Sequence, residues 1–194
     1  VPVGLYRTFV RIPEDEGFSY DSWSRNLRLG RTFMSGGPII SLTVDGRPIG
    51  DTVHLPRRGG TVEVTATVES AFPVRSLEVV VAGVVVAATR SVVGERTLTL
   101  HERMPITKDT WIAARAGGPT YFDSPRHRDV WGRGAMAHTS PVYVACGAEW
   151  TGYDPAVSEY MLTLVHGSLS YIDSMLPRGS TDSRLHHHGE PDHR

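Results

Sequence analysis

Histidines near the end of the chain form the pattern best suited to binding a metal. His186 and His188 make an H-x-H pair, followed by Glu190, Asp192 and His193. Imidazole and carboxylate groups at short spacing are typical zinc ligands. The segment is also rich in Gly, Pro and polar residues, so a solvated tail without metal is the alternative. His186, His188 and His193 are candidate ligands, with no substrate pocket expected beside them.

Three further polar residues lie in strand-like segments. His138 precedes two hydroxyl residues and a proline in AHTSPVYV, which favours a surface position where a strand bends. Such a histidine either serves a functional site or hydrogen bonds a turn. Arg31 and Arg115 need acceptors for their guanidinium groups while their stems are buried. For Arg115 that acceptor is a carboxylate of a neighbouring domain or one of its own domain.

The familiar catalytic motifs are absent from the sequence. It has no G-x-S-x-G elbow, no P-loop, no H-E-x-x-H and no C-x-x-C. The single cysteine, Cys146, ends an apolar run, and we expect it to be a small buried apolar residue. We therefore assign no catalytic residue to this chain.

Composition limits the partners and the compartment. Lys and Arg number 20 against 21 Asp and Glu, a balance that argues against nucleic acid as a partner. The longest apolar run, residues 79–88, is well short of the roughly 20 residues that a membrane-spanning helix needs. One cysteine excludes an internal disulfide. This is compatible with a cytoplasmic protein without establishing one, and it leaves the oligomeric state open.

The elements that would position these residues are mostly strands. Alternating apolar and polar residues predict strands over the segments 5–12, 31–35, 39–45, 61–70, 76–81, 84–90, 95–104, 110–116 and 137–146, the last broken at Pro141. Ala82-Gly83 predicts a hairpin turn. Many short strands separated by turn signals are typical of an antiparallel, immunoglobulin-like β-sandwich. The fold class is therefore mainly β.

Two helices interrupt this pattern. Tyr20, Trp23 and Leu27 have helical spacing, with Ser19 as N-cap and Gly30 as the stop signal. A second helix is expected after Asp154 as N-cap and Pro155 at the first position. Its apolar residues recur at helical spacing, namely Val157, Tyr160, Met161, Leu164, Val165, Leu169 and Ile172. The sequence thus predicts a sandwich with one short N-terminal helix and one C-terminal helix.

The order of these segments resembles a known family. The resemblance is carried by GRTF (30–33), GPI (37–39), WIAAR (111–115) and AHTSPVY (137–143). In combination they are similar to the C-terminal region of the carbaryl-hydrolase-like (CehA/McbA) metallohydrolases of the PHP superfamily. The resemblance covers residues 1–176. Typical members have Thr-Asn or Ser-Asn before Gly-Pro, whereas this chain has Ser35-Gly36.

The resemblance implies a PHP metal domain that precedes this chain in a longer protein. That domain would bind zinc or manganese through H-x-H, D-x-H and further His and Glu ligands, none of which is identifiable here. This chain would then be an accessory domain whose partner is its own PHP domain. Its interface or pocket-edge candidates are Arg31, Ser35, Gly37, Pro38, Arg115 and His138.

The expected organisation has four parts. Residues 1–35 follow the metal domain as a strand and a short helix, 36–150 form the sandwich, 151–176 the C-terminal helix and 177–194 a polar, flexible tail. One alternative is a free-standing module that binds carbohydrate or protein. A third reading, an enzyme complete in itself, would need His138 and the tail histidines to converge on the sandwich.

Overall fold

The computed structural model describes residues 6–117, 135–147, 150, 152 and 155–175. The chain divides into two compact units, Val1–Gly152 and Tyr153–Arg194. The described strands and helix α1 (Tyr20–Arg28) belong to the first unit, and helix α2 (Pro155–Met175) belongs to the second. Each unit is described by itself.

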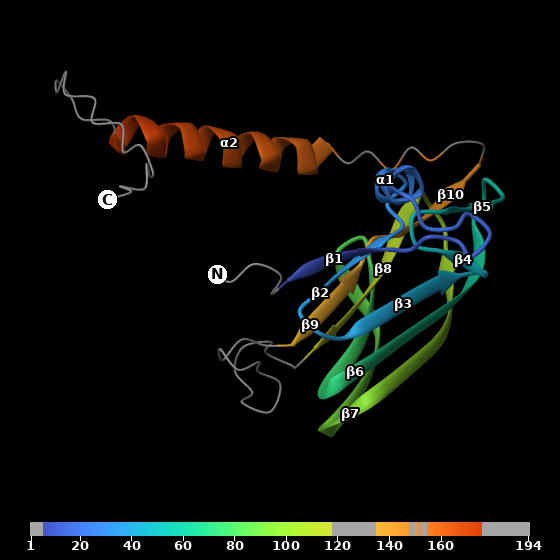
Figure 1. Cartoon of the computed structure of the whole chain (residues 1–194). Helices are drawn as coiled ribbons and strands as arrows, with labels where there is room; N and C mark the ends of the chain where they lie inside the picture. Colours follow the sequence, from blue (N-terminus) through green and yellow to red (C-terminus); the bar gives the residue numbers. More distant parts are fainter. Residues whose placement is uncertain (1–5, 118–134, 148–149, 151, 153–154, 176–194) are drawn as a thin grey trace, which may run out of the picture. The chain divides into compact units, whose positions relative to one another are not determined.

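The strands of the first unit form one sheet that curls on itself (Figure 1). They are β1 (Arg7–Val10), β2 (Thr32–Ser35), β3 (Ile39–Val44), β4 (Arg47–Pro48), β5 (Thr52–Leu55), β6 (Gly60–Val81), β7 (Val84–Ile106), β8 (Thr110–Gly117), β9 (Met136–Thr139) and β10 (Val142–Cys146). The main strand order is β1-β2-β9-β8-β6-β3-β4, with β7 beside β6 and β10 between β8 and β5. All pairs are antiparallel except β10 with β5.

Strand β6 belongs to both layers of the sandwich. Its first part, up to Glu69, pairs with β3, and its last part, from Ser76, pairs with β8. Between these parts the register with β7 shifts at Glu69/Val74 and again at Val74/Ser76. Such bulges bend a strand and increase its twist. Consequently β3 contacts β8 and β9 without pairing with either, as expected for facing layers.

Valines from the two layers make up most of the core. Val44, Val62, Val64, Val79, Val142 and Val144 are fully buried, together with Leu77 and Ile112. Along most of their strands they alternate with exposed or half-buried residues, as a half-buried strand requires. The predicted class, mainly β with an antiparallel sandwich and two helices, is confirmed.

The sequence-based strand boundaries differ from the structure in one main respect. The segments 61–70 and 76–81 were expected to be separate strands, and they form the single strand β6. In the same way, 84–90 and 95–104 belong to the single strand β7. The prediction was wrong here because a bulge keeps the chain extended while it interrupts the alternation of apolar and polar residues.

The predicted hairpin turn at Ala82-Gly83 is confirmed. Ala82 and Gly83 have φ values of 46° and 87°, and they join Val81 of β6 to Val84 of β7. Asp45 and Gly46 have φ values of 47° and 74° and join β3 to β4 in the same way. Two successive positive φ values define the type I′ turn, whose twist matches that of the flanking strands.

Helix α1 has the predicted ends but buries an unexpected side. Ser19 and Ser22 form a reciprocal capping box, and Gly30 follows the helix with φ 70°. The buried side chains are the polar Ser22 and Asn26, whereas Tyr20 is 77% exposed and Trp23 37%. Apolar residues at helical spacing usually face the core. Here hydrogen bonds bury the polar side and leave the aromatic side outward.

Helix α2 is the main described element of the second unit. Pro155 is its first residue, as predicted, and the expected N-cap Asp154 lies outside the described residues. The apolar side chains that define its helical spacing are about half exposed or more. The described helices include none with both the length and the hydropathy that a membrane crossing requires.

Candidate functional site

The sheet brings two of the sequence-predicted residues together. Arg115 of β8 lies directly opposite His138 of β9 on one side and Glu78 of β6 on the other. His138 in turn lies opposite Met34 of β2. Directly opposite residues project from the same face of a sheet. Met34, His138, Arg115 and Glu78 therefore form one row across four strands, which we call the outer row.

The outer row faces away from the core. Its neighbours along the strands, Leu77, Ala114, Ala116 and Ala137, have at most 1% of their surface exposed. Because side chains alternate between the two faces of a strand, the outer row points to the opposite side. His138 and Arg115 are exposed there.

Glu78 is the acceptor for Arg115 in the outer row. The Nε of Arg115 donates to Glu78 Oε2 at 2.7 Å, and Arg90 approaches Oε1 at 3.4 Å. The side chain of Glu78 is only 13% exposed, against 45% for that of Arg115. Thus Arg115 has a carboxylate partner within its own domain. The Nδ1 atom of His138 lies 3.3 Å from the carbonyl oxygen of Thr139.

Arg31 lies in a different place, between α1 and the turn after β4. Its Nη1 donates to Asn26 Oδ1 at 3.0 Å and its Nη2 to Asp51 Oδ1 at 3.3 Å. Glu16 Oε1 lies 3.9 Å from Nη1. The structure therefore does not place Arg31 with Arg115 and His138. It joins α1 to the sandwich.

Glu16 completes this cluster, and its pKa is lowered by its neighbours. It accepts from Arg25 Nη2 and from Asn26 Nδ2, each at 2.7 Å. The hydrogen bond from Arg25, followed by that from Asn26, lowers the pKa of Glu16 below its usual 4.5. These contacts favour the charged carboxylate in the folded state.

This shift predicts a pH dependence of stability. Because the folded pKa is depressed, the contribution of Glu16 is present above the unfolded pKa and is lost as pH falls through the folded one. Between about pH 6 and pH 3 the melting temperature of the wild type should therefore fall further than that of Glu16→Gln. Thermal unfolding followed by circular dichroism at several pH values checks this. Equal falls in both proteins would contradict it, and Glu14→Gln, at an exposed carboxylate nearby, is the control.

The Ser35 turn is closed on itself. The hydroxyl of Ser35 accepts from the Gly37 N–H at 2.8 Å and donates to the Pro38 carbonyl, and Gly36 N–H donates to Met136 at 2.9 Å. Ser35 and Pro38 are both buried. The hydroxyl of Ser35 thus shapes the connection from β2 to β3.

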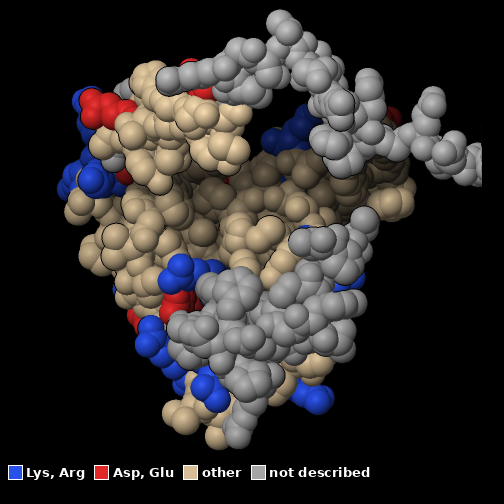
Figure 2. Space-filling view, turned by 90° about the vertical axis from the view of Figure 1, so that its left-hand side faces the viewer, with Lys and Arg blue, Asp and Glu red and all other residues tan. Residues whose placement is uncertain are grey.

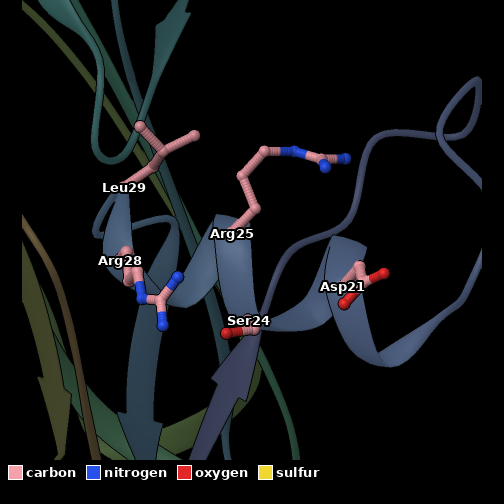
Figure 3. A pocket seen from close by; sticks show the side chains of 5 residues that line it. All are labelled: Asp21, Ser24, Arg25, Arg28 and Leu29. Carbon is pink, nitrogen blue, oxygen red and sulfur yellow. The ribbon is translucent and has the colours of Figure 1, made fainter.

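A shallow pocket on α1 escaped the sequence analysis. It is lined by Asp21, Ser24, Arg25, Arg28 and Leu29 (Figure 3). In the close-up the charged ends of Arg25 and Arg28 point in different directions and do not converge on one point. This arrangement offers an exposed polar surface, with no set of groups placed for catalysis.

An aromatic cluster on β8 and β10 was also missed. Tyr143 lies opposite Trp111, and the ring of Trp150 meets that of Tyr143 edge-on at 4.9 Å. The indole N–H of Trp150 donates to the Thr110 carbonyl at 3.2 Å. Trp111 and Tyr143 alternate with the buried Ile112 and the buried valines of β10, so they lie on the outer side. That alternation was the signal available in the sequence.

Cys146 and the tail histidines are the remaining candidates from the sequence. Cys146 packs against the core, but it is partly rather than fully buried, and this burial followed by the nearby Asp109 carboxylate raises the pKa of its thiol. A raised pKa lowers the fraction of reactive thiolate. His186, His188 and His193 lie outside the described residues. Within the part of the chain that the structure describes, no three His, Cys, Asp or Glu side chains are grouped as a metal site would need.

Charges of both signs are mixed on the surface. On the face shown in Figure 2, basic and acidic side chains lie next to one another in several places, among the residues drawn in colour. Comparison with protein-family models, with curated proteins and with solved structures gave no match for this chain.

Proposed function

We propose that this chain is an accessory domain of a PHP-type metal-dependent hydrolase of the CehA/McbA kind and docks on the metal domain of the same protein. The outward aromatic side of α1 carries this proposal. Phe18, Tyr20 and Trp23 are exposed, and the rings of Tyr20 and Trp23 are stacked with their centroids 6.2 Å apart. Contiguous apolar side chains on a surface are typical of an interface.

A second observation concerns three of the four segments that resemble the family. Residues 30–33, 111–115 and 137–143 are far apart in the chain, yet most of their residues belong to β2, β8, β9 and β10. Strand β9 pairs with both β2 and β8, and β10 pairs with β8. These segments thus build one continuous surface, on which His138 and Arg115 are presented.

In the intact protein the chemistry would belong to the metal domain. Zinc or manganese bound there would lower the pKa of a water molecule, which then attacks a carbamate, ester, amide or phosphoester bond. The residues of this chain would position that domain and shape the edge of its pocket. By itself the chain would not hydrolyse these substrates when metal is added.

Docking through α1 predicts a strong effect of Trp23→Ala. In the intact protein the change should lower the hydrolytic rate and loosen the domain contact, because truncating a central aromatic residue of an interface typically costs about 2 kcal/mol or more. Because Trp23 is only 37% exposed, the melting temperature of the isolated variant is measured as well, to separate lost packing within the domain from lost docking. Steady-state hydrolysis, together with hydrogen exchange of the α1 amides, measures both effects.

The matched control is Val92→Ala, a truncation of an apolar residue that is 89% exposed on β7. It should leave the hydrolytic rate unchanged. Equal rates in the wild type and both variants would contradict docking through α1. The coding sequence upstream of Val1 tests the family directly. An H-x-H motif and, shortly before Val1, a D-x-H motif are expected there, and a different upstream domain would refute the assignment.

The aromatic cluster of Trp111, Tyr143 and Trp150 supports a second candidate, a carbohydrate-binding module. Aromatic side chains offer a flat apolar face and, in Tyr and Trp, a polar group at the edge. Titration of the chain with a panel of oligosaccharides, followed by tryptophan fluorescence, distinguishes the candidates. Saturable quenching that is lost in Trp150→Ala would favour this module over the accessory domain.

A further inference from the structure

Strand β7 lies at the edge of the sheet. Its only partner among the described strands is β6, with a regular register from Gly60 opposite Ile106 to Glu69 opposite Thr97. No other described strand pairs with the opposite side of β7, where the Thr89 side chain from the first half of β7 reaches Thr99. Unpaired backbone groups along such an edge can accept a further strand.

The contacts of Glu63 show which backbone groups face the open side. Its N–H donates to Asp45 Oδ1 at 2.7 Å, and its C=O accepts from the Asp45 N–H at 2.8 Å. Both groups therefore point toward the β3 side of β6, away from β7. Glu63 and Arg103 are consequently a pair without mutual hydrogen bonds, and such pairs alternate along an antiparallel ladder.

The same alternation fixes the orientation of the β7 backbone. His101 and Thr99, opposite Thr65 and Thr67, follow Arg103 at two-residue intervals. Like Arg103, they turn their N–H and C=O groups to the open side. The Thr99 carbonyl accepts from the Thr89 hydroxyl at 3.1 Å. A carbonyl has a second lone pair, so it can still accept from another strand.

The side chains along this edge complement those of a second copy. In an antiparallel, two-fold arrangement centred on Thr99, opposite residues lie equally far on either side of Thr99. Leu98 of one copy therefore lies opposite Leu100 of the other. Arg96 then faces Glu102, and Glu95 faces Arg103. These four charged residues are exposed and have no ion-pair partner within 4 Å among the described residues. The second copy would supply four ion pairs by symmetry.

Alternative registers are unfavourable. Because the outward-facing residues alternate, the register can shift only in steps of two residues. One such shift places Arg96 opposite Leu100, and the reverse shift places Glu102 opposite Leu98. Leu98 and Leu100 are only 6% and 4% exposed, so either shift sets a charge against the edge of the core.

We propose that two copies of this chain form a two-fold dimer by pairing their β7 edges, centred on Thr99. Charges on the core-facing side of an edge strand often discourage pairing. Here Arg96 and Glu102 lie on the same side of β7 as Leu98 and Leu100, and each meets the opposite sign in the pairing register. In the dimer, Leu98 and Leu100 thus extend the core across the interface, and Arg96 and Glu102 specify its register.

Sedimentation equilibrium of the 194-residue chain at moderate salt tests the dimer. The wild type should be dimeric, and Glu102→Arg should weaken the dimer by at least about tenfold, since it sets like charges opposite each other twice. The double change Arg96→Glu and Glu102→Arg should restore wild-type affinity. A monomeric wild type, or a dimer that is insensitive to Glu102→Arg, would overturn the proposal.

A backbone variant gives an independent check. Thr99→Pro removes an N–H that faces the open side, so the β6–β7 ladder keeps its hydrogen bonds while the dimer is lost. Thr99→Val keeps the N–H and should remain dimeric. If Thr99→Pro does not fold, as judged by circular dichroism, the charge-reversal pair decides alone. A folded Thr99→Pro variant that stays dimeric would refute pairing through β7.

Discussion

Replacing Gly50 with alanine should destabilise the sandwich by about 3 kcal/mol or more. Gly50 has φ 85°, a conformation that costs an L-residue energy, and its N–H donates to the Pro141 carbonyl at 2.9 Å. An added Cβ would collide with the Leu29 carbonyl oxygen and would lie 2.9 Å from the Gly30 carbonyl carbon. Backbone atoms cannot rotate away as a side chain can. The C-terminal end of α1 would have to shift.

Gly46→Ala is the matched control for this prediction. Gly46 has φ 74°, and an added Cβ there would meet no atom within 4 Å. Its expected cost is the conformational penalty alone, about 1 kcal/mol. Urea unfolding of both variants separates collision from backbone strain. Similar losses of unfolding free energy in the two variants would show that α1 moves away from the added Cβ without an energetic cost.

Asn26→Ala should destabilise the domain by about 3 to 5 kcal/mol. Asn26 is fully buried, and its Nδ2 donates to Glu16 at 2.7 Å and to the Ser22 carbonyl at 2.8 Å. Its Oδ1 accepts from Arg31 at 3.0 Å. The Nε of Arg31 is already buried without a partner. Truncation would therefore remove one hydrogen-bond partner from each of the charged side chains of Glu16 and Arg31, both of which are partly buried.

Arg28→Ala on the same helix is the control, because Arg28 is exposed and takes no part in the hydrogen bonds and ion pairs that join Glu16, Asn26 and Arg31. Its effect should stay within about 0.5 kcal/mol. Chemical unfolding curves for both variants give the comparison. A loss for Asn26→Ala as small as that of the control would mean that the cluster contributes little to holding α1 in place.

The sequence predicted most elements of this fold because their signals are local. Ser19 as N-cap, Gly30 as the stop of α1 and Ala82-Gly83 as a hairpin turn each act within a few residues. Alternating valines likewise identified the strands. The merging of predicted strands into β6 and β7 was missed, since bulges depend on how the two strands fit each other.

The candidate site was only partly predictable for a similar reason. His138 and Arg115 were selected one by one, and their pairing follows from a register that joins distant segments. The burial of Asn26 was not foreseen, because it requires Glu16 and Arg31 to converge beneath the helix. Apolar residues at helical spacing usually face the core, but here tertiary hydrogen bonds bury Ser22 and Asn26 and leave the aromatic side of α1 exposed.

The bent β6–β7 hairpin has a consequence for how the domain unfolds. One hairpin, bent where its register shifts, supplies backbone hydrogen bonds to both layers, through β3 at one end and β8 at the other. If either layer loosens, one end of β6 and β7 loses its neighbour, and the other layer is built on these same two strands. We therefore expect the two layers to unfold together on heating, in a single cooperative transition.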